Sequence, residues 1–137
     1  DHQPGVNGLW IEEVMGKTKE QITFEEQQRK YCVPYIIWAN YDMGKSPQTL
    51  NTSSNYLGAL LLDQAGIDRS DYMKFLVQMQ KEIPILNAFG YQTKDEVWHS
   101  FEETIEVSKW IYDYKIVQYN AMFDTKRNKK YYIPKNV

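Results

Sequence analysis

The hydrophobic residues in the middle of the chain have helical spacing. A helix is predicted from about residue 53 to Gly66, because four apolar residues recur at intervals of one, three and four: Tyr56, Leu57, Leu60 and Leu61. Either serine at its start can cap the first turn, and the glycine supplies a left-handed stop. A second helix, capped by Asp68 and ending before Pro84, is predicted on similar spacing of Tyr72, Phe75, Leu76 and Met79.

Two shorter helices are predicted near the start of the chain, and a longer one near its end. The first covers residues 8–15 and stops at Gly16. The second begins at the capping box Thr23-Phe24-Glu25-Glu26 and runs to about Lys30. After a strand-like segment at 85–92, a last helix is predicted between a possible capping box at Ser100 and about Phe123. Its apolar stripe comprises Val107, Trp110, Ile111, Tyr114, Val117 and Met122.

One apolar run has no polar alternation and is rich in β-branched and aromatic residues: Val33-Pro34-Tyr35-Ile36-Ile37-Trp38-Ala39. This composition predicts a core strand at 33–39, buried on both faces as in a parallel sheet covered by helices. A long loop follows at 40–53. The pattern therefore predicts one α/β domain, or part of one, that is helix-rich with a few strands.

Composition and charge indicate a globular domain and argue against nucleic-acid binding and membrane-spanning helices. The chain has 137 residues, of which 42% are hydrophobic and 25% are charged, as in a packed globular domain. A formal net charge of −2 gives no general field for holding nucleic acid, so no nucleic-acid partner is expected. Cys32 is the single cysteine, which excludes an internal disulfide, and its neighbours predict a small buried hydrophobe. No apolar run approaches the ~20 residues that a membrane helix needs.

The first residues carry the most specific candidate chemistry. Asp1 and His2 place a carboxylate next to an imidazole, and both groups are ligands for divalent metals. Neighbouring side chains can converge on one ion where a parallel strand ends, which is where α/β proteins place their sites. By itself the dipeptide is a weak signal, and a solvated terminus is the favoured interpretation of it.

Two other groups have a plainer interpretation. His99 with Glu102 and Glu103 has a spacing that could hold a metal, although an exposed histidine beside an acidic helix start is the favoured interpretation. The basic tail at 124–137 contains Lys126-Arg127-Asn128-Lys129-Lys130 and could bind a polyanion. A solvated tail is favoured there.

Several segments, taken in order, resemble the C-terminal part of lipoteichoic acid synthase-like phosphoglycerol transferases, which are sulfatase-type members of the alkaline phosphatase superfamily. The resemblance covers most of the chain up to about Phe123. No single segment is decisive, and the match lies in their order and spacing. The segments are Asp1-His2-Gln3-Pro4, residues 33–42, residues 52–58 before Leu60-Leu61-Leu62, Ala65-Gly66-Ile67, Phe75-Leu76, Ile83-Pro84, and Tyr114 with Gln118-Tyr119-Asn120.

The resemblance implies a specific role for the first residues. The family's Gly-Asp-His motif supplies two ligands to a catalytic divalent metal, usually manganese, and these ligands map onto Asp1 and His2 in a metal-site loop at 1–7. The family's nucleophilic threonine and acidic metal ligand lie upstream, so this chain by itself is expected to be inactive. The implied fold is the C-terminal portion of an alkaline phosphatase-like α/β/α sandwich, with residues 1–137 forming a fragment of the catalytic domain.

The same resemblance implies the surroundings of the parent protein. The expected partners are the rest of the catalytic domain and a lipid head group or another phosphate or sulfate ester as substrate. The parent is expected to be membrane-anchored and extracytoplasmic. A strand that expects sheet neighbours could also lead to oligomers through an exposed edge. The alternative is a free-standing, non-catalytic helical interaction module in which Asp1 and His2 are incidental.

Overall fold

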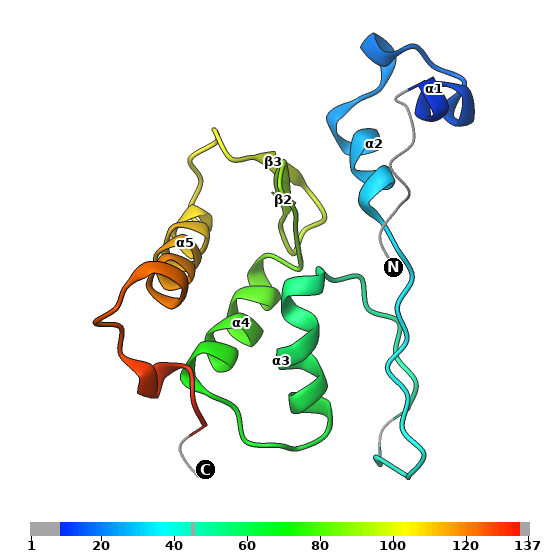
Figure 1. Cartoon of the computed structure of the whole chain (residues 1–137). Coiled ribbons are helices and arrows are strands. Elements are labelled where there is room, and N and C mark those ends of the chain that lie inside the picture. Colours follow the sequence, from blue (N-terminus) through cyan, green and yellow to red (C-terminus); the bar gives the residue numbers. More distant parts are fainter. Residues whose placement is uncertain (1–8, 45, 135–137) are drawn as a thin grey trace. The chain divides into compact units, whose positions relative to one another are not determined.

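The computed structural model describes residues 9–44 and 46–134. The chain divides into two compact units, residues 1–38 and residues 39–137. In both units helices are the main element, and the second unit adds a small sheet (Figure 1). The predicted mixture of helices with a few strands is thus confirmed at this coarse level.

The first unit contains short helices that begin and end at local signals. Helix α1 (Leu9–Met15) ends at Gly16, whose φ of 62° lies in the left-handed region that glycine adopts without strain. A short 3-10 helix, η1 (Lys19–Gln21), follows. The helix predicted over 8–15 is confirmed to within one residue.

Helix α2 (Phe24–Gln28) confirms the predicted capping box. The backbone N–H of Glu26 donates to the Thr23 hydroxyl over 3.2 Å, and the backbone N–H of Thr23 donates to the Glu26 carboxylate over 3.1 Å. A 3-10 turn, η2 (Arg29–Tyr31), continues the helix to about the predicted end. Lys17 pairs with the other carboxylate oxygen of Glu26 at 2.5 Å, which links α2 to the segment after α1.

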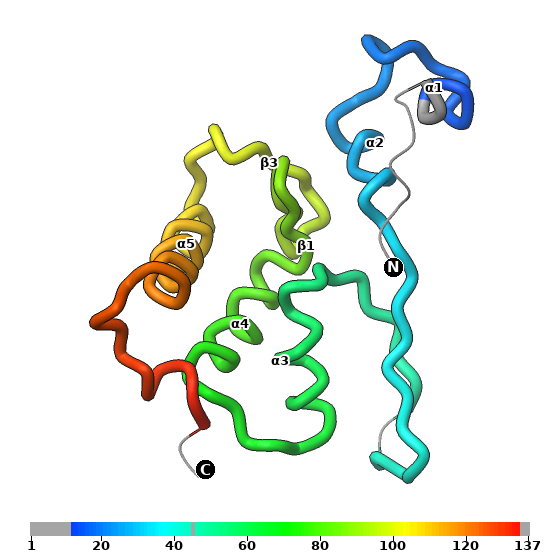
Figure 2. Tube along the Cα trace, in the orientation of Figure 1, coloured from blue at the N-terminus to red at the C-terminus, as the bar shows by residue number. Residues whose placement is uncertain are grey.

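The prediction of a buried core strand at 33–39 is wrong for this chain by itself. Figure 2 shows residues 32–38 as an extended tube, and none of them belongs to a strand. Ile36 and Trp38 are 89% and 79% exposed, and Cys32, predicted to be buried, is exposed as well. Apolar composition makes a strand only when neighbouring strands supply the ladder and other layers cover both faces. In the part of the chain that the structure describes, the sheet lies entirely within residues 85–100.

Helices α3 (Ser54–Gln64) and α4 (Asp71–Glu82) lie side by side in the second unit (Figure 1). Both were predicted, and Gly66 ends the first of them with φ 69°. The cap of α4 is Ser70, not the predicted Asp68. The Ser70 hydroxyl accepts the backbone N–H of Met73 over 3.2 Å, whereas the Asp68 carboxylate accepts the N–H of Arg69.

The strand-like segment at 85–92 consists of two strands of an antiparallel sheet with three strands. The order is β1 (Ile85–Leu86), β2 (Gly90–Gln92) and β3 (Trp98–Ser100), with Leu86 opposite Tyr91 and Tyr91 opposite His99. The Ser53 hydroxyl donates to the Leu86 carbonyl over 2.8 Å, so the residue at the N-cap position of α3 fixes the start of the sheet and its side chain does not form the predicted cap.

Helix α5 (Ser108–Phe123) begins eight residues later than the possible capping box at Ser100. Residue 100 instead ends β3, and a turn and loop occupy residues 101–107. After α5 the basic tail forms a 3-10 helix, η3 (Lys129–Tyr131). It is attached to the helix, because the Tyr132 hydroxyl donates to the Val117 carbonyl over 2.9 Å and its ring packs against Tyr72. The described part of the tail is therefore folded against α4 and α5.

The core of the second unit lies between α3, α4, α5 and β2. Its buried members are Tyr56, Ala59, Leu60, Leu76, Met79, Ile83, Tyr91, Ile111 and Tyr114. Aliphatic and aromatic side chains from four elements thus share one cluster, which is the main source of stability for a unit of this size. Within the described ranges, every helix is too short or too polar to cross a bilayer.

Candidate functional site

The predicted metal ligands, Asp1 and His2, lie outside the described residues. Within residues 9–44 and 46–134, the structure brings together no group of three or more histidine, cysteine or acidic side chains that could hold a metal. The candidate groups that can be placed are therefore the His99 cluster and the basic tail.

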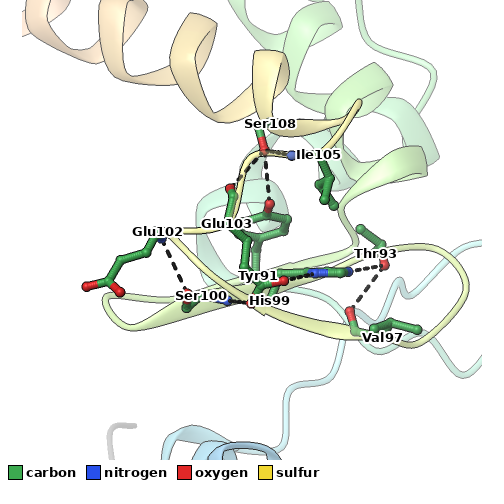
Figure 3. Close-up of polar contacts among 9 residues, drawn as sticks. All are labelled: Tyr91, Thr93, Val97, His99, Ser100, Glu102, Glu103, Ile105 and Ser108. Carbon is green, nitrogen blue, oxygen red and sulfur yellow. Dashed lines mark hydrogen bonds and ion pairs between the residues drawn. The ribbon is translucent and has the colours of Figure 1, made fainter.

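His99 lies on β3 and has partners on both ring nitrogens (Figure 3). Its Nδ1 lies 2.7 Å from Oε2 of Glu103, and its Nε2 lies 3.4 Å from the hydroxyl of Thr93. The ring stacks on that of Tyr91, with centroids 5.5 Å apart. The His99 side chain is only 15% exposed. The favoured prediction of an exposed histidine beside a helix start is therefore wrong in both respects.

Glu103 joins this cluster through the turn that follows β3. Its second carboxylate oxygen accepts the backbone N–H of Ser100 over 2.9 Å. The hydrogen bond from His99, and after it the one from the Ser100 backbone, lowers the pKa of the Glu103 carboxyl. Only half of the predicted capping box forms, because the Ser100 hydroxyl accepts the backbone N–H of Glu102 while that of Glu103 donates to the Ser100 carbonyl, and no helix follows until Ser108.

Glu102 does not take part in this arrangement. Figure 3 shows its carboxylate directed away from His99, while its backbone N–H donates to the Ser100 hydroxyl over 3.3 Å. A metal held by all three predicted residues would need the second carboxylate to face the imidazole. The local backbone turns it outward instead, so the structure brings together only His99 and Glu103.

The carboxylate of Glu103, the imidazole of His99 and the hydroxyl of Thr93 follow one another as the groups of a proton relay do. The Thr93 hydroxyl, however, is unsuitable as a nucleophile. The Thr93 hydroxyl donates to the Val97 carbonyl over 3.1 Å, and the residue is buried. A nucleophile needs access to substrate and a base that accepts its proton, and this hydroxyl has its proton committed to a carbonyl. The cluster therefore braces the hairpin and the turn after it.

Two residues that the sequence analysis did not single out, Tyr91 and Ser108, extend this set of contacts to α5. The Tyr91 hydroxyl lies 3.2 Å from the Ser108 hydroxyl, which also accepts the backbone N–H of Ile105 over 3.0 Å. These contacts connect β2 to the first residue of α5 (Figure 3). Helical spacing gives no signal for them, because the partners are far apart in sequence and lie on elements of different type.

The tail forms one side of a shallow groove on the second unit. Its lining comes from α4, α5 and η3: Phe75, Asp113, Ile116, Val117 and Tyr131. A single carboxylate among apolar side chains offers no set of converging polar groups that would define a substrate.

No protein-family model, curated protein or solved structure matches this chain.

Proposed function

We propose that this chain is the downstream part of the catalytic domain of a metal-dependent phosphoglycerol transferase or sulfatase-like hydrolase. The observation that carries the proposal is the order and spacing of the segments that resemble this family, from Asp1-His2 through residues 33–42 and 52–58 to Tyr114. In that setting the chain completes an alkaline phosphatase-like α/β/α sandwich. The parent acts on phosphate or sulfate esters outside the membrane that anchors it.

The donor set at the start of the chain fits the metal that the family uses. A carboxylate and a neutral imidazole suit Mn²⁺, and Asp1 and His2 would hold the ion in the parent. A bound divalent ion would polarise the phosphoryl oxygens and favour attack by the upstream threonine. The contribution of this chain is to bind and orient the ion with two side chains. The remaining ligand and the nucleophile belong to the preceding part of the domain.

The exposed run at 33–39 supports an incomplete domain. Val33 and Ile37 occur on one side of an extended chain, and Ile36 and Trp38 on the other, since successive side chains point to opposite faces. All four are classed as exposed. Exposing so many apolar side chains to water is unfavourable in free energy. In a complete domain, neighbouring strands and covering helices would bury them.

The second candidate is a free-standing helical interaction module. The observation that favours it is the core of the second unit, which draws on α3, α4, α5 and β2 without help from the first unit. On this view Asp1 and His2 have no chemical role. The two candidates differ in what precedes the chain, because only the enzyme requires an upstream threonine and a further acidic ligand.

The mass of the native gene product, detected with an antibody against this chain, separates the two. A much larger membrane-anchored product with the upstream residues is the expected result. In that parent, His2→Ala should abolish release of the phosphoglycerol unit and weaken Mn²⁺ binding measured by electron paramagnetic resonance. The matched control is His99→Gln, because His99 is the other histidine of the chain and serves the hairpin. Undiminished turnover of His2→Ala would refute the assignment.

A further inference from the structure

Helix α5 carries a second apolar face on the side away from the core. Four side chains recur at intervals of four, three and four residues and are 66%, 42%, 63% and 65% exposed: Tyr112, Ile116, Tyr119 and Phe123. At about 100° per residue they fall within about 60° of one another around the helix. Of the two α5 residues buried in the core, Tyr114 lies on the opposite side of the helix and Ile111 lies about 100° from Tyr112. We call the four exposed residues the outer stripe.

Cations border the outer stripe on both sides. Lys109 and Lys115 are each offset by about 60° from Tyr112, in opposite directions around the helix. Their ammonium groups lie 5.8 Å from the ring centroid of Trp110 and 5.2 Å from that of Phe101. On the surface of a folded unit, an apolar stripe with a lysine on each flank can meet acyl chains and anionic head groups at the same time.

The tail adds more positive charge near the same helix. Lys126, Arg127, Lys129 and Lys130 occur on the segment that the Tyr132 hydroxyl attaches to the Val117 carbonyl of α5. Residues 108–137 contain seven Lys or Arg and two Asp, a net charge of +5. The preceding 107 residues contain nine basic and sixteen acidic residues, a net charge of −7. A chain that is acidic overall therefore gathers its positive charge at one end.

We propose that the outer stripe and its bordering cations dock on the surface of an anionic lipid bilayer. Tyrosine and phenylalanine suit the boundary between head groups and acyl chains, and lysine and arginine suit anionic head groups. A nucleic acid would use the cations but would have no use for Ile116 and Phe123. A neutral protein partner would bury the stripe but gain nothing from the two lysines that flank it or from the four cations of the tail. The docking surface does not depend on the proposed enzymatic function.

Vesicle co-sedimentation of the full chain tests this docking surface. The chain should bind vesicles that contain phosphatidylglycerol, bind pure phosphatidylcholine vesicles at least about tenfold more weakly, and lose binding as salt is raised. The variant Tyr119→Ser/Phe123→Ser should weaken binding to the anionic vesicles by about tenfold or more. Its matched control is Tyr41→Ser/Phe89→Ser, which removes an exposed tyrosine and an exposed phenylalanine elsewhere. The control should bind as the unmodified chain does.

A charge-reversal pair tests the cations. Lys109→Glu/Lys115→Glu should also weaken binding to anionic vesicles by about tenfold. The control, Lys19→Glu/Lys81→Glu, makes the same change in net charge on exposed residues that do not belong to α5 or the tail. Because all these positions are on the surface, circular dichroism melts should be close to that of the unmodified chain.

Three outcomes would overturn the docking surface. Equal binding to neutral and anionic vesicles, or no binding to either, removes the role of charge. Loss of binding in the lysine variant with no loss in the stripe variant, together with binding to soluble polyphosphate, indicates a polyanion site. A dimer by light scattering that Tyr119→Ser/Phe123→Ser converts to a monomer assigns the stripe to a second copy of the chain.

Discussion

The two units of this chain are built from similar helices but hold them in different ways. In the second unit, α3, α4 and α5 share one core with β2, and Tyr56, Met79 and Ile83 in that core have no exposed surface. In the first unit, the buried side chains among residues 12–38 are Ile22 and Gln28. Its helices depend instead on capping bonds and on the Lys17–Glu26 pair.

This difference shows that local sequence signals determine where helices begin and end, whereas a shared core supplies most of their stability. A capping box and a terminal glycine decide where a helix begins and ends, but each contributes only about 1 kcal/mol. Helices of seven and five residues are marginal by themselves in water. The first unit is therefore expected to be the less stable one unless a partner covers it.

The largest expected effect comes from opening the core of the second unit. Met79→Ala should destabilise that unit by about 2–5 kcal/mol, because it leaves a cavity among fully buried neighbours. Urea unfolding, followed by amide exchange of α3 and α4, measures the loss. Met122→Ala is the matched control, since this side chain is 68% exposed and its removal should cost under about 0.5 kcal/mol. Equal effects of the two changes would contradict the assigned core.

A capping change should affect only the first unit. Thr23→Ala removes the hydroxyl that accepts the Glu26 N–H and should cost α2 about 1 kcal/mol. Faster amide exchange at residues 24–28, with unchanged exchange in α4, is the expected result. The control is Thr49→Ala, an exposed loop threonine in the second unit. Faster unfolding of the whole chain, or loss of exchange protection in α4, would show that the two units are not held separately.

Two buried tyrosines allow a finer test within the core, because their hydroxyls differ in partners. The Tyr91 hydroxyl bonds to Ser108, so Tyr91→Phe should destabilise by about 1 kcal/mol. Among the described residues, the Tyr56 hydroxyl has no hydrogen-bond partner, and burial raises its pKa. Tyr56→Phe should therefore be neutral or stabilise by up to about 1 kcal/mol. Thermal melts of both variants measure the difference, and a loss of stability in Tyr56→Phe would point to a bridging water.

Sequence reasoning succeeded where a signal was local and failed where a partner decided the outcome. The capping box at Thr23 and the stop at Gly66 follow from residues within one turn, and both are confirmed. The Ser100 segment has the same pattern but makes only one of the two capping contacts, and it closes a turn in which Glu103 also bonds His99. The run at 33–39 has the composition of a core strand but needs neighbours that the described residues do not supply.

The candidate site was predictable only in part for the same reason. The proximity of His99 and Glu103 was expected from helical spacing, but it arises in the turn after β3. The contact with Thr93 did not, because it depends on how β2 and β3 are paired. The outer stripe of α5 has the same helical spacing as the core stripe, so periodicity alone cannot tell which face meets the core. Burial in the structure makes that distinction.

The smallest expected effect concerns acid, which should loosen one local contact in each unit and leave the core intact. The bond from Lys17, followed by that from the Thr23 backbone, lowers the pKa of Glu26, and the bond from His99 lowers that of Glu103. A carboxyl whose pKa is lower in the folded state stabilises fully above its unfolded value, about 4.3, and loses this contribution as pH falls through the folded value.

Amide exchange and chemical shifts between pH 6 and pH 3 measure this loss. Signals of residues 23–28 and 99–103 should change below about pH 4, while those of Met79 and Ile83 stay constant. Glu26→Gln should remove the pH dependence from the first region and leave the second unchanged. Glu25→Gln, its neighbour outside the reciprocal capping contacts, is the matched control and should leave both in place. A cooperative loss of all signals over this range would mean that the core of the second unit depends on these surface carboxylates, against the contrast drawn between the two units.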